Sequence, residues 1–173
     1  MIAAALLVLL AGAPTPRAGC PVPATRALPE LVGRWEVLVL GNLDRPRPDS
    51  MRAESTISPD LQDCLLQERL RAHDGSPPYE SITFWGTNGG DSTIQRVLAH
   101  SQHGRFGVYQ GRRVGDELTL RQQNLGSPQP DVVVVEHVVR IADRDHFTIS
   151  SRLSNDRGRR WTALSRSEYR RAR

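Results

Sequence analysis

The segment Glu30-Leu31-Val32-Gly33-Arg34-Trp35-Glu36-Val37-Leu38-Val39-Leu40 decides the fold of this chain. It is entered through a glycine that lies two residues before a tryptophan, and its valines and tryptophan favour an extended backbone. The rest of the chain has the same character, because short alternating runs are separated by Gly, Pro, Asn and Asp. No long stretch repeats apolar residues every three or four positions, as an amphipathic helix would. We therefore interpret the segment as the first strand of an all-β domain.

Alternation and turn residues together predict ten strands along the chain. They cover residues 32–40, 51–58, 62–72, 79–87, 92–100, 105–110, 117–123, 132–141, 145–153 and 160–169. Short links between successive strands are typical of an up-and-down antiparallel meander, and closure into a barrel removes exposed edges. The predicted fold class is a single up-and-down antiparallel β-barrel of about eight to ten strands. The proline-rich link 41–50 is long enough to cover a barrel mouth.

Length and charge limit the other possibilities. The 173 residues suit one domain, and no internal repeat is visible. The net charge is +4, and every positive side chain is an arginine. These arginines are scattered along strand positions expected to face solvent, without interleaved aromatic residues. The pattern favours a basic surface and no nucleic-acid partner.

Residues 1–19 are interpreted as a secretory signal peptide, which leaves 20–173 as the barrel domain. The apolar run from Ile2 to Leu10 is too short to cross a bilayer and is followed by small residues and prolines. Ala11-Gly12-Ala13 and Pro16-Arg17-Ala18 both fit a cleavage site. The sequence therefore predicts a secreted or periplasmic protein without a transmembrane segment.

Cys20 and Cys64 are the only cysteines. In an exported protein two cysteines pair by default, so we predict a disulfide that ties the N-terminal segment across the barrel. Two alternatives stay open. Both thiols remain free, or Ala18-Gly19-Cys20 ends a lipoprotein box and Cys20 carries a lipid, although Arg17 stands where that box has an aliphatic residue.

Several short motifs follow one another between residues 20 and 171. They are Cys20, Gly33-Arg34-Trp35-Glu36-Val37, Cys64-Leu65-Leu66-Gln67-Glu68, Ser81, Phe84-Trp85, Gln95, Gly104, Tyr109-Gln110-Gly111, Asp116-Glu117-Leu118-Thr119-Leu120, Ser154-Asn155-Asp156-Arg157-Gly158-Arg159-Arg160-Trp161 and Tyr169-Arg170-Arg171. In this order they resemble the lipocalins and, more closely, the small exported lipocalin-like (calycin-type) bacterial domains of unknown function. The resemblance implies a barrel and no established reaction. It also implies that Trp35 closes the bottom of the barrel, stacked under Arg170 or Arg171.

Polar residues on apolar strand faces are the candidate ligand contacts. A barrel of this size leaves room for a small ligand, and the chain has only three each of Trp, Tyr and Phe to fill it. Glu68, Gln95 and Glu136 share faces with apolar residues, and such groups need a partner inside an apolar cavity. Trp85 and Tyr109 are candidates for the mouth of that cavity, beneath the 41–50 link.

The sequence leaves three functions in competition. The first is the binding of a small apolar or amphipathic molecule in the lumen. The second is a cyclase or hydrolase with Glu68 or Glu136 as acid-base. The third is an envelope-interaction protein whose interior is filled, with an internal Glu–Arg pair that uses Arg121 or Arg140.

No nucleophile elbow, phosphate loop or dinucleotide fingerprint occurs, so no cofactor is predicted. The spacing His100-x-x-His103 lacks the neighbouring cysteine or acids of a metal site, so no metal is predicted either.

Overall fold

The computed structural model describes residue 20 and residues 22–74, 78–88, 92–101, 103–123 and 133–173. The segment interpreted as a signal peptide, residues 1–19, lies outside this described part. None of the described helices has the length and apolar character that a bilayer crossing needs.

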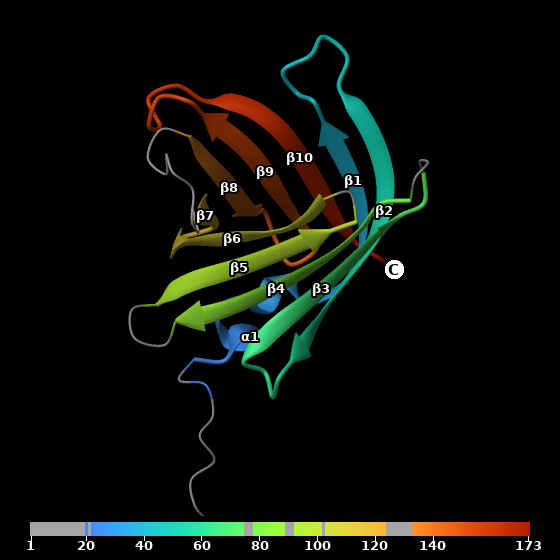
Figure 1. Ribbon diagram of the computed structural model, residues 1–173. Coiled ribbons are helices and arrows are strands. Elements are labelled where there is room, and N and C mark those ends of the chain that lie inside the picture. Colours follow the sequence, from blue (N-terminus) through green and yellow to red (C-terminus); the bar gives the residue numbers. More distant parts are fainter. Residues whose placement is uncertain (1–19, 21, 75–77, 89–91, 102, 124–132) are drawn as a thin grey trace, which may run out of the picture.

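The described residues form ten strands, which close into a single antiparallel barrel (Figure 1). The strands are β1 (Gly33–Gly41), β2 (Asp49–Asp60), β3 (Leu65–Ala72), β4 (Glu80–Asn88), β5 (Thr93–His100), β6 (His103–Val114), β7 (Glu117–Gln122), β8 (Val134–Ile141), β9 (His146–Ser154) and β10 (Thr162–Arg171). Each strand pairs with its neighbours in the sequence, and β1 closes the barrel against β10. The predicted fold class and strand order are confirmed.

The first strand shows how the sequence sets inside and outside. Trp35 and Val37 are buried in the lumen, whereas Arg34 and Glu36 between them are exposed. Trp35 lies opposite Ser55 of β2 on one side and opposite a residue of β10 on the other. Both edges of β1 are therefore hydrogen-bonded, as the closed-barrel interpretation required.

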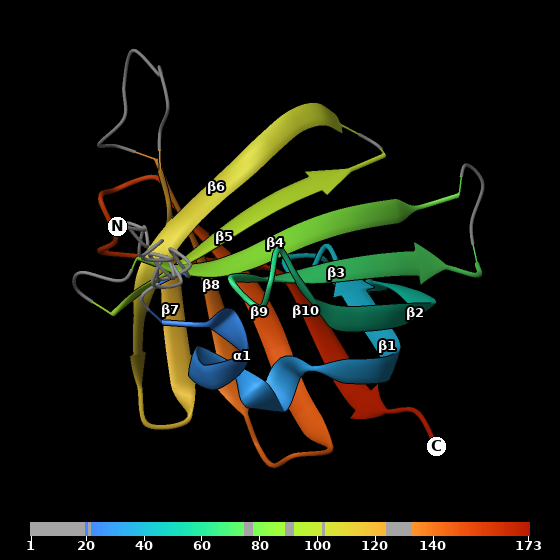
Figure 2. The same cartoon turned by 90° about the horizontal axis from the view of Figure 1, so that it is seen from below.

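A short N-terminal segment that strand periodicity did not predict closes one end of the barrel. It consists of α1 (Ala24–Ala27) and the 3-10 turn Pro29–Leu31, and Figure 2 shows α1 lying across the barrel end that faces the viewer. The side chains of Ala24, Leu28 and Leu31 are fully buried there. Four helical residues are too few to leave a periodic pattern, and their burial rather than their helix propensity holds them in place.

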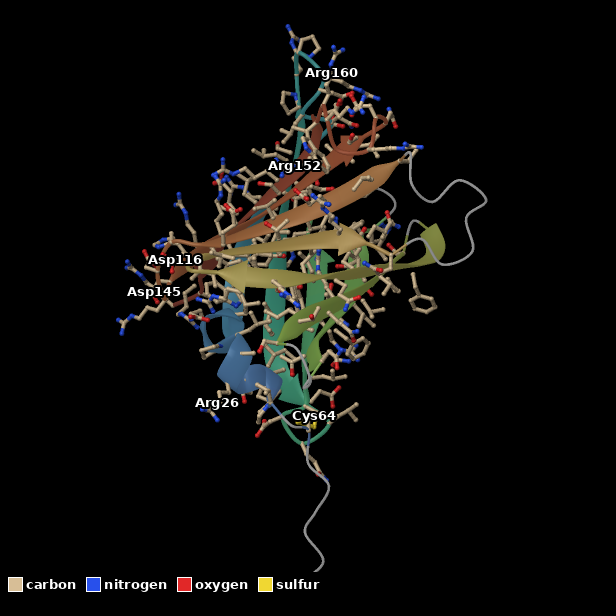
Figure 3. The ribbon with its side chains drawn as sticks, turned by 90° about the vertical axis from the view of Figure 1, so that its left-hand side faces the viewer. Arg26, Cys64, Asp116, Asp145, Arg152 and Arg160 are labelled. Atoms are coloured by element: carbon tan, nitrogen blue, oxygen red, sulfur yellow. A yellow bond between two sulfur atoms is a disulfide. The ribbon has the colours of Figure 1, made fainter. Side chains whose placement is uncertain are left out.

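Covalent and polar contacts fasten this segment. Cys20 and Cys64 form the predicted disulfide, with a Cα–Cα distance of 5.4 Å, and Cys64 lies at the α1 end in Figure 3. The Thr87 hydroxyl donates a hydrogen bond to the Val22 carbonyl at 2.6 Å. Because both sulfurs are used in the bond, lipidation of Cys20 is not compatible with this structure.

Aromatic packing fills the half of the lumen next to α1. The Trp35 ring meets Phe147 edge-to-face with centroids 4.8 Å apart, and its indole N–H donates to the Leu31 carbonyl. The Arg171 guanidinium stacks 4.3 Å from the Trp35 ring. The arginine cover implied by the lipocalin resemblance is therefore confirmed, with Arg171 in that place.

Candidate functional site

A cavity of about 150 Å³ occupies the half of the lumen away from α1. Its apolar wall includes Val39 near the end of β1 and Leu98 near the end of β5, whereas Trp35 and Ile94 near the starts of these strands are packed in the core. Serines of β9 and β10, among them Ser151 and Ser167, also line it. The barrel is therefore packed at one end and hollow at the other.

A larger hollow lies on the outer wall and is a weaker candidate. It measures about 550 Å³ and runs over β1, β2 and β10. Exposed charged side chains such as Glu36, Arg52 and Glu54 line it, and water satisfies these groups without any ligand. In the lumen, by contrast, Glu68 Oε2, Thr83 Oγ1 and Arg96 Nε are buried without partners among the described residues.

A layer of buried polar side chains forms the floor of the cavity. The members of this polar layer are Ser55, Glu68, Thr83, Arg96, Tyr109, His137 and Tyr169, each at most 8 % exposed. They come from seven of the strands, and all of them except Ser55 and Tyr109 line the cavity directly. Polar groups buried in this way need hydrogen-bond partners, and the partners present decide what else the layer can bind.

Glu68 is the acidic member of the layer. One of its oxygens, Oε1, accepts hydrogen bonds from the Tyr169 hydroxyl at 2.8 Å and the Ser55 hydroxyl at 3.0 Å. The other oxygen, Oε2, is buried and has no partner among the described residues. Burial, followed by the nearby Glu68 carboxylate, raises the pKa of Tyr169 well above its usual value, so this hydroxyl keeps its proton and donates it.

Arg96 is the basic member. Its guanidinium lies 4.7 Å from the ring of Trp85, and its Nη1 is 2.6 Å from His137 Nδ1. Its Nε is buried without a partner, and no carboxylate in the described part of the chain forms an ion pair with it. Stacking and one hydrogen bond fix the plane of the cation but leave its charge uncompensated.

His137 is held neutral between these groups. Its ring stacks on Tyr109 with centroids 4.0 Å apart. Burial, and then the adjacent Arg96 cation, hold the pKa of His137 well below its usual value of 6.5. Since Nδ1 faces the Arg96 donor, the neutral ring accepts there and carries its proton on Nε2.

This neutral histidine predicts a pH-dependent stability. The folded pKa is depressed, so the contribution of His137 is fully present above its unfolded pKa and is lost as the pH falls below about 6.5. One such group changes the free energy of unfolding by at most about 1.4 kcal/mol per pH unit. Urea melts between about pH 7.5 and about pH 5 should show that the free energy of unfolding falls more steeply on acidification for the native protein than for His137→Gln. In this variant the amide oxygen still accepts a hydrogen bond from Arg96. Parallel curves for the two proteins would contradict the assignment.

Two of the predicted contact residues lie in the polar layer and three do not. Glu68 and Tyr109 belong to it, although Tyr109 is buried against the His137 ring rather than placed at the mouth. Trp85 is fully buried beneath Arg96 and is not a mouth residue. The expectation that Gln95 and Glu136 face the lumen is wrong, because their neighbours Arg96 and His137 line the cavity and successive side chains of a strand alternate.

Glu136 is buried for a different reason. On the outer wall its carboxylate is covered by Arg121, whose Nε lies 3.0 Å away, and by Arg152, whose Nε lies 2.7 Å away. Arg152 in turn stacks on Trp161, with its guanidinium carbon 4.4 Å from the ring. The Glu–Arg pair that the sequence suggested thus exists with Arg121, but outside the lumen. Glu68 and Glu136 lie on opposite faces of the barrel wall and share no site.

The sequence interpretation missed Arg96, His137 and Tyr169. A signal was present for Arg96, because Ile94 and Leu98 flank it with the alternation of a lumen-facing row. Among the described residues, no three histidine, cysteine or acidic side chains are placed to hold a metal ion.

Comparisons with known proteins show the fold. No protein-family model matches the chain, and no curated protein matches it. Rv2717c from M. tuberculosis has a similar structure, with a TM-score of 0.62, 19 % identity, and coverage of 88 % of this chain and 99 % of that one. The S-type phycobiliprotein lyase CPES from Guillardia theta aligns with a TM-score of 0.55 and 12 % identity, over 88 % of this chain and 94 % of its own. At these identities the likeness shows a shared fold, which in this chain is the closed antiparallel barrel.

Proposed function

We propose that this barrel binds a small amphipathic molecule in its lumen. One observation carries the proposal: the cavity floor presents the buried polar atoms Glu68 Oε2, Thr83 Oγ1 and Arg96 Nε without partners among the described residues. Leaving such an atom unsatisfied costs about 1–3 kcal/mol, and more when the group is charged. Three such atoms on one cavity floor therefore favour a site for a polar ligand group over a filled interior.

The distribution of polar and apolar groups supports an amphipathic ligand. Polar atoms lie on the floor, whereas Val39, Leu98 and Ile149 form apolar parts of the wall above. A few convergent polar groups in an otherwise apolar cavity are the usual composition of small-molecule sites. A cavity of 150 Å³ is comparable with one that holds benzene, so larger ligands extend towards the mouth.

The competing functions receive less support. A structural protein with a filled barrel does not account for the cavity or for the unpartnered polar atoms on its floor. A cyclase or hydrolase that uses paired carboxylates needs a second carboxylate beside Glu68, and Glu136 lies on the outer wall. A lumen-binding protein requires neither a filled interior nor a second carboxylate.

The proposal includes export. Disulfides such as Cys20–Cys64 persist in oxidising compartments, which supports a secreted or periplasmic protein. Residues 1–19 then serve as its signal peptide, with the barrel domain following from residue 20.

Binding of an environment-sensitive apolar dye tests the lumen proposal. The native protein should bind the dye with a Kd of about 1 μM, or about −8 kcal/mol. Leu98→Trp enlarges a side chain on the cavity wall and should abolish the fluorescence gain. Val97→Trp, the matched control, places the same ring on the opposite face of β5 and should leave it unchanged. Equal binding by both variants would show that the dye binds elsewhere, and an absence of binding by the native protein would contradict the proposal.

A further inference from the structure

Among the arginines that the structure describes, Arg96 alone is buried, with 6 % of its surface exposed. Other partly buried arginines have carboxylate partners: Arg113 pairs with Glu30 at 2.9 Å and Arg171 with Asp145 at 3.1 Å. Arg96 contacts the neutral His137 ring and the face of Trp85, and no carboxylate of the described chain forms an ion pair with it. A desolvated cation without a counter-charge is costly, and an anion brought by a ligand would remove that cost.

Glu68 does not serve as the missing counter-charge. It lines the same cavity, but it forms no ion pair with Arg96 and accepts hydrogen bonds from Ser55 and Tyr169. The layer therefore presents a cation on β5 and an acid on β3 as separate groups. A ligand group that binds at Arg96 therefore meets a guanidinium that is not tied up in a direct ion pair.

The geometry of the guanidinium suits a planar anion. His137 occupies Nη1, which leaves the edge formed by Nε and Nη2 without a protein partner in the described chain. Stacking on Trp85 at 4.7 Å holds the plane of the group. Two parallel N–H donors in a fixed plane match the two oxygens of a carboxylate, which a single ammonium group would not do.

The charge of the cavity rim has the same sign. The Leu43 N–H of the β1–β2 loop donates a hydrogen bond to the carbonyl of Leu164, near the start of β10, at 3.2 Å, which brings this loop close to the β9–β10 turn. The β1–β2 loop and the β9–β10 turn contain the five arginines Arg45, Arg47, Arg157, Arg159 and Arg160 against the two aspartates Asp44 and Asp156, and a third aspartate, Asp49, begins β2. Arg160 lies at the barrel end opposite Cys64 (Figure 3). The net positive charge of these two loops attracts anions towards the hollow half of the lumen.

We propose that the lumen ligand is a small carboxylate, or an amphiphile with a carboxylate end, whose two oxygens pair with the Nε and Nη2 edge of Arg96. This inference rests on the lumen-binding function proposed above. It adds the chemical class of the ligand and its orientation, with the carboxylate on the polar layer and the apolar part towards the mouth.

Benzoate and benzamide provide a matched pair of probes, because they share size and shape but only benzoate is charged at pH 7. Displacement of the apolar dye, or calorimetry, gives both affinities. Native protein should bind benzoate at least about tenfold more tightly than benzamide, since a hydrogen bond to a charged group is roughly twice as strong as a neutral one. Equal affinities would overturn the inference.

Two variants locate the preference. Arg96→Met keeps a similar length without charge and should bring the benzoate-to-benzamide ratio to about one while the dye still binds. Arg112→Met removes an exposed arginine of β6 and should leave the ratio unchanged. A ratio retained in Arg96→Met overturns the inference. Dye binding without any benzoate preference in native protein overturns it but leaves the lumen function standing, whereas absence of both contradicts both proposals. The native ratio does not depend on whether Arg96→Met folds.

Discussion

Replacing Trp35 with alanine is expected to lower the free energy of unfolding by about 3–5 kcal/mol, the range for deleting a large buried aromatic side chain. Trp35 is 1 % exposed and touches Phe147 and Tyr169, with ring centroids 4.8 and 6.4 Å away. Phe147 and Tyr169 are themselves stacked 4.1 Å apart, so they are not free to collapse into the space. The substitution also removes the indole donor to the Leu31 carbonyl and the surface on which Arg171 stacks.

Phe106→Ala is the control for this experiment. Phe106 is 75 % exposed on the outer wall, and surface changes of this kind usually alter stability by less than about 0.5 kcal/mol. Both variants and the native protein would be unfolded in denaturant, and their midpoints and slopes compared. A loss below about 1 kcal/mol for Trp35→Ala would be inconsistent with a ring that plugs the barrel.

Strand order was predictable because its signals are local. Turn residues and alternation place ten strands in the correct sequence, and the short links between them favour neighbour pairing. Strand ends were less accurate, since pairing extends strands past the local pattern. Pro59, interpreted as a turn residue, lies inside β2 opposite Leu66, and β6 runs from His103 to Val114 rather than over 105–110.

The candidate site was harder to predict, because a period of two defines two strand faces but does not say which one is inside. Glu68 was placed correctly, since Leu66 and Leu70 flank it on one face and Arg69 and Arg71 mark the other. On β5 both faces carry apolar residues. On β8 the valine run makes the two faces alike in composition, so Glu136 and His137 could not be assigned to a side.

Interactions between distant segments lay beyond the sequence pattern. His137 and Arg96 are 41 residues apart, and Tyr169 and Glu68 are 101 residues apart. Only barrel closure brings these pairs together. A histidine among valines and a tyrosine near the C-terminus carry no local sign of their partners, and the polar layer is therefore a property of the closed sheet rather than of any strand.

Removing the disulfide is expected to lower the free energy of unfolding by about 4 kcal/mol, the chain-entropy value for a loop of this length. The bond joins residues separated by 44 positions and holds the N-terminal segment against the β2–β3 turn. The other attachments of that segment are non-covalent, and they include the Thr87 bond to Val22, the Arg113–Glu30 ion pair and the apolar contacts of α1. The double variant Cys20→Ala, Cys64→Ala should therefore melt at lower denaturant concentration than native protein under oxidising conditions.

Reduction supplies the internal control for that measurement. A reductant should bring the native midpoint close to that of the double variant and leave the variant itself unchanged. Because the cavity lies at the opposite end of the lumen from α1, both proteins should bind the apolar dye equally well under conditions where they are folded. Equal stability of the native protein with and without reductant would show that the polar and apolar contacts of the segment hold it without the bond. Loss of dye binding in the folded variant would instead show that the N-terminal segment supports the polar layer as well as the packed half of the barrel.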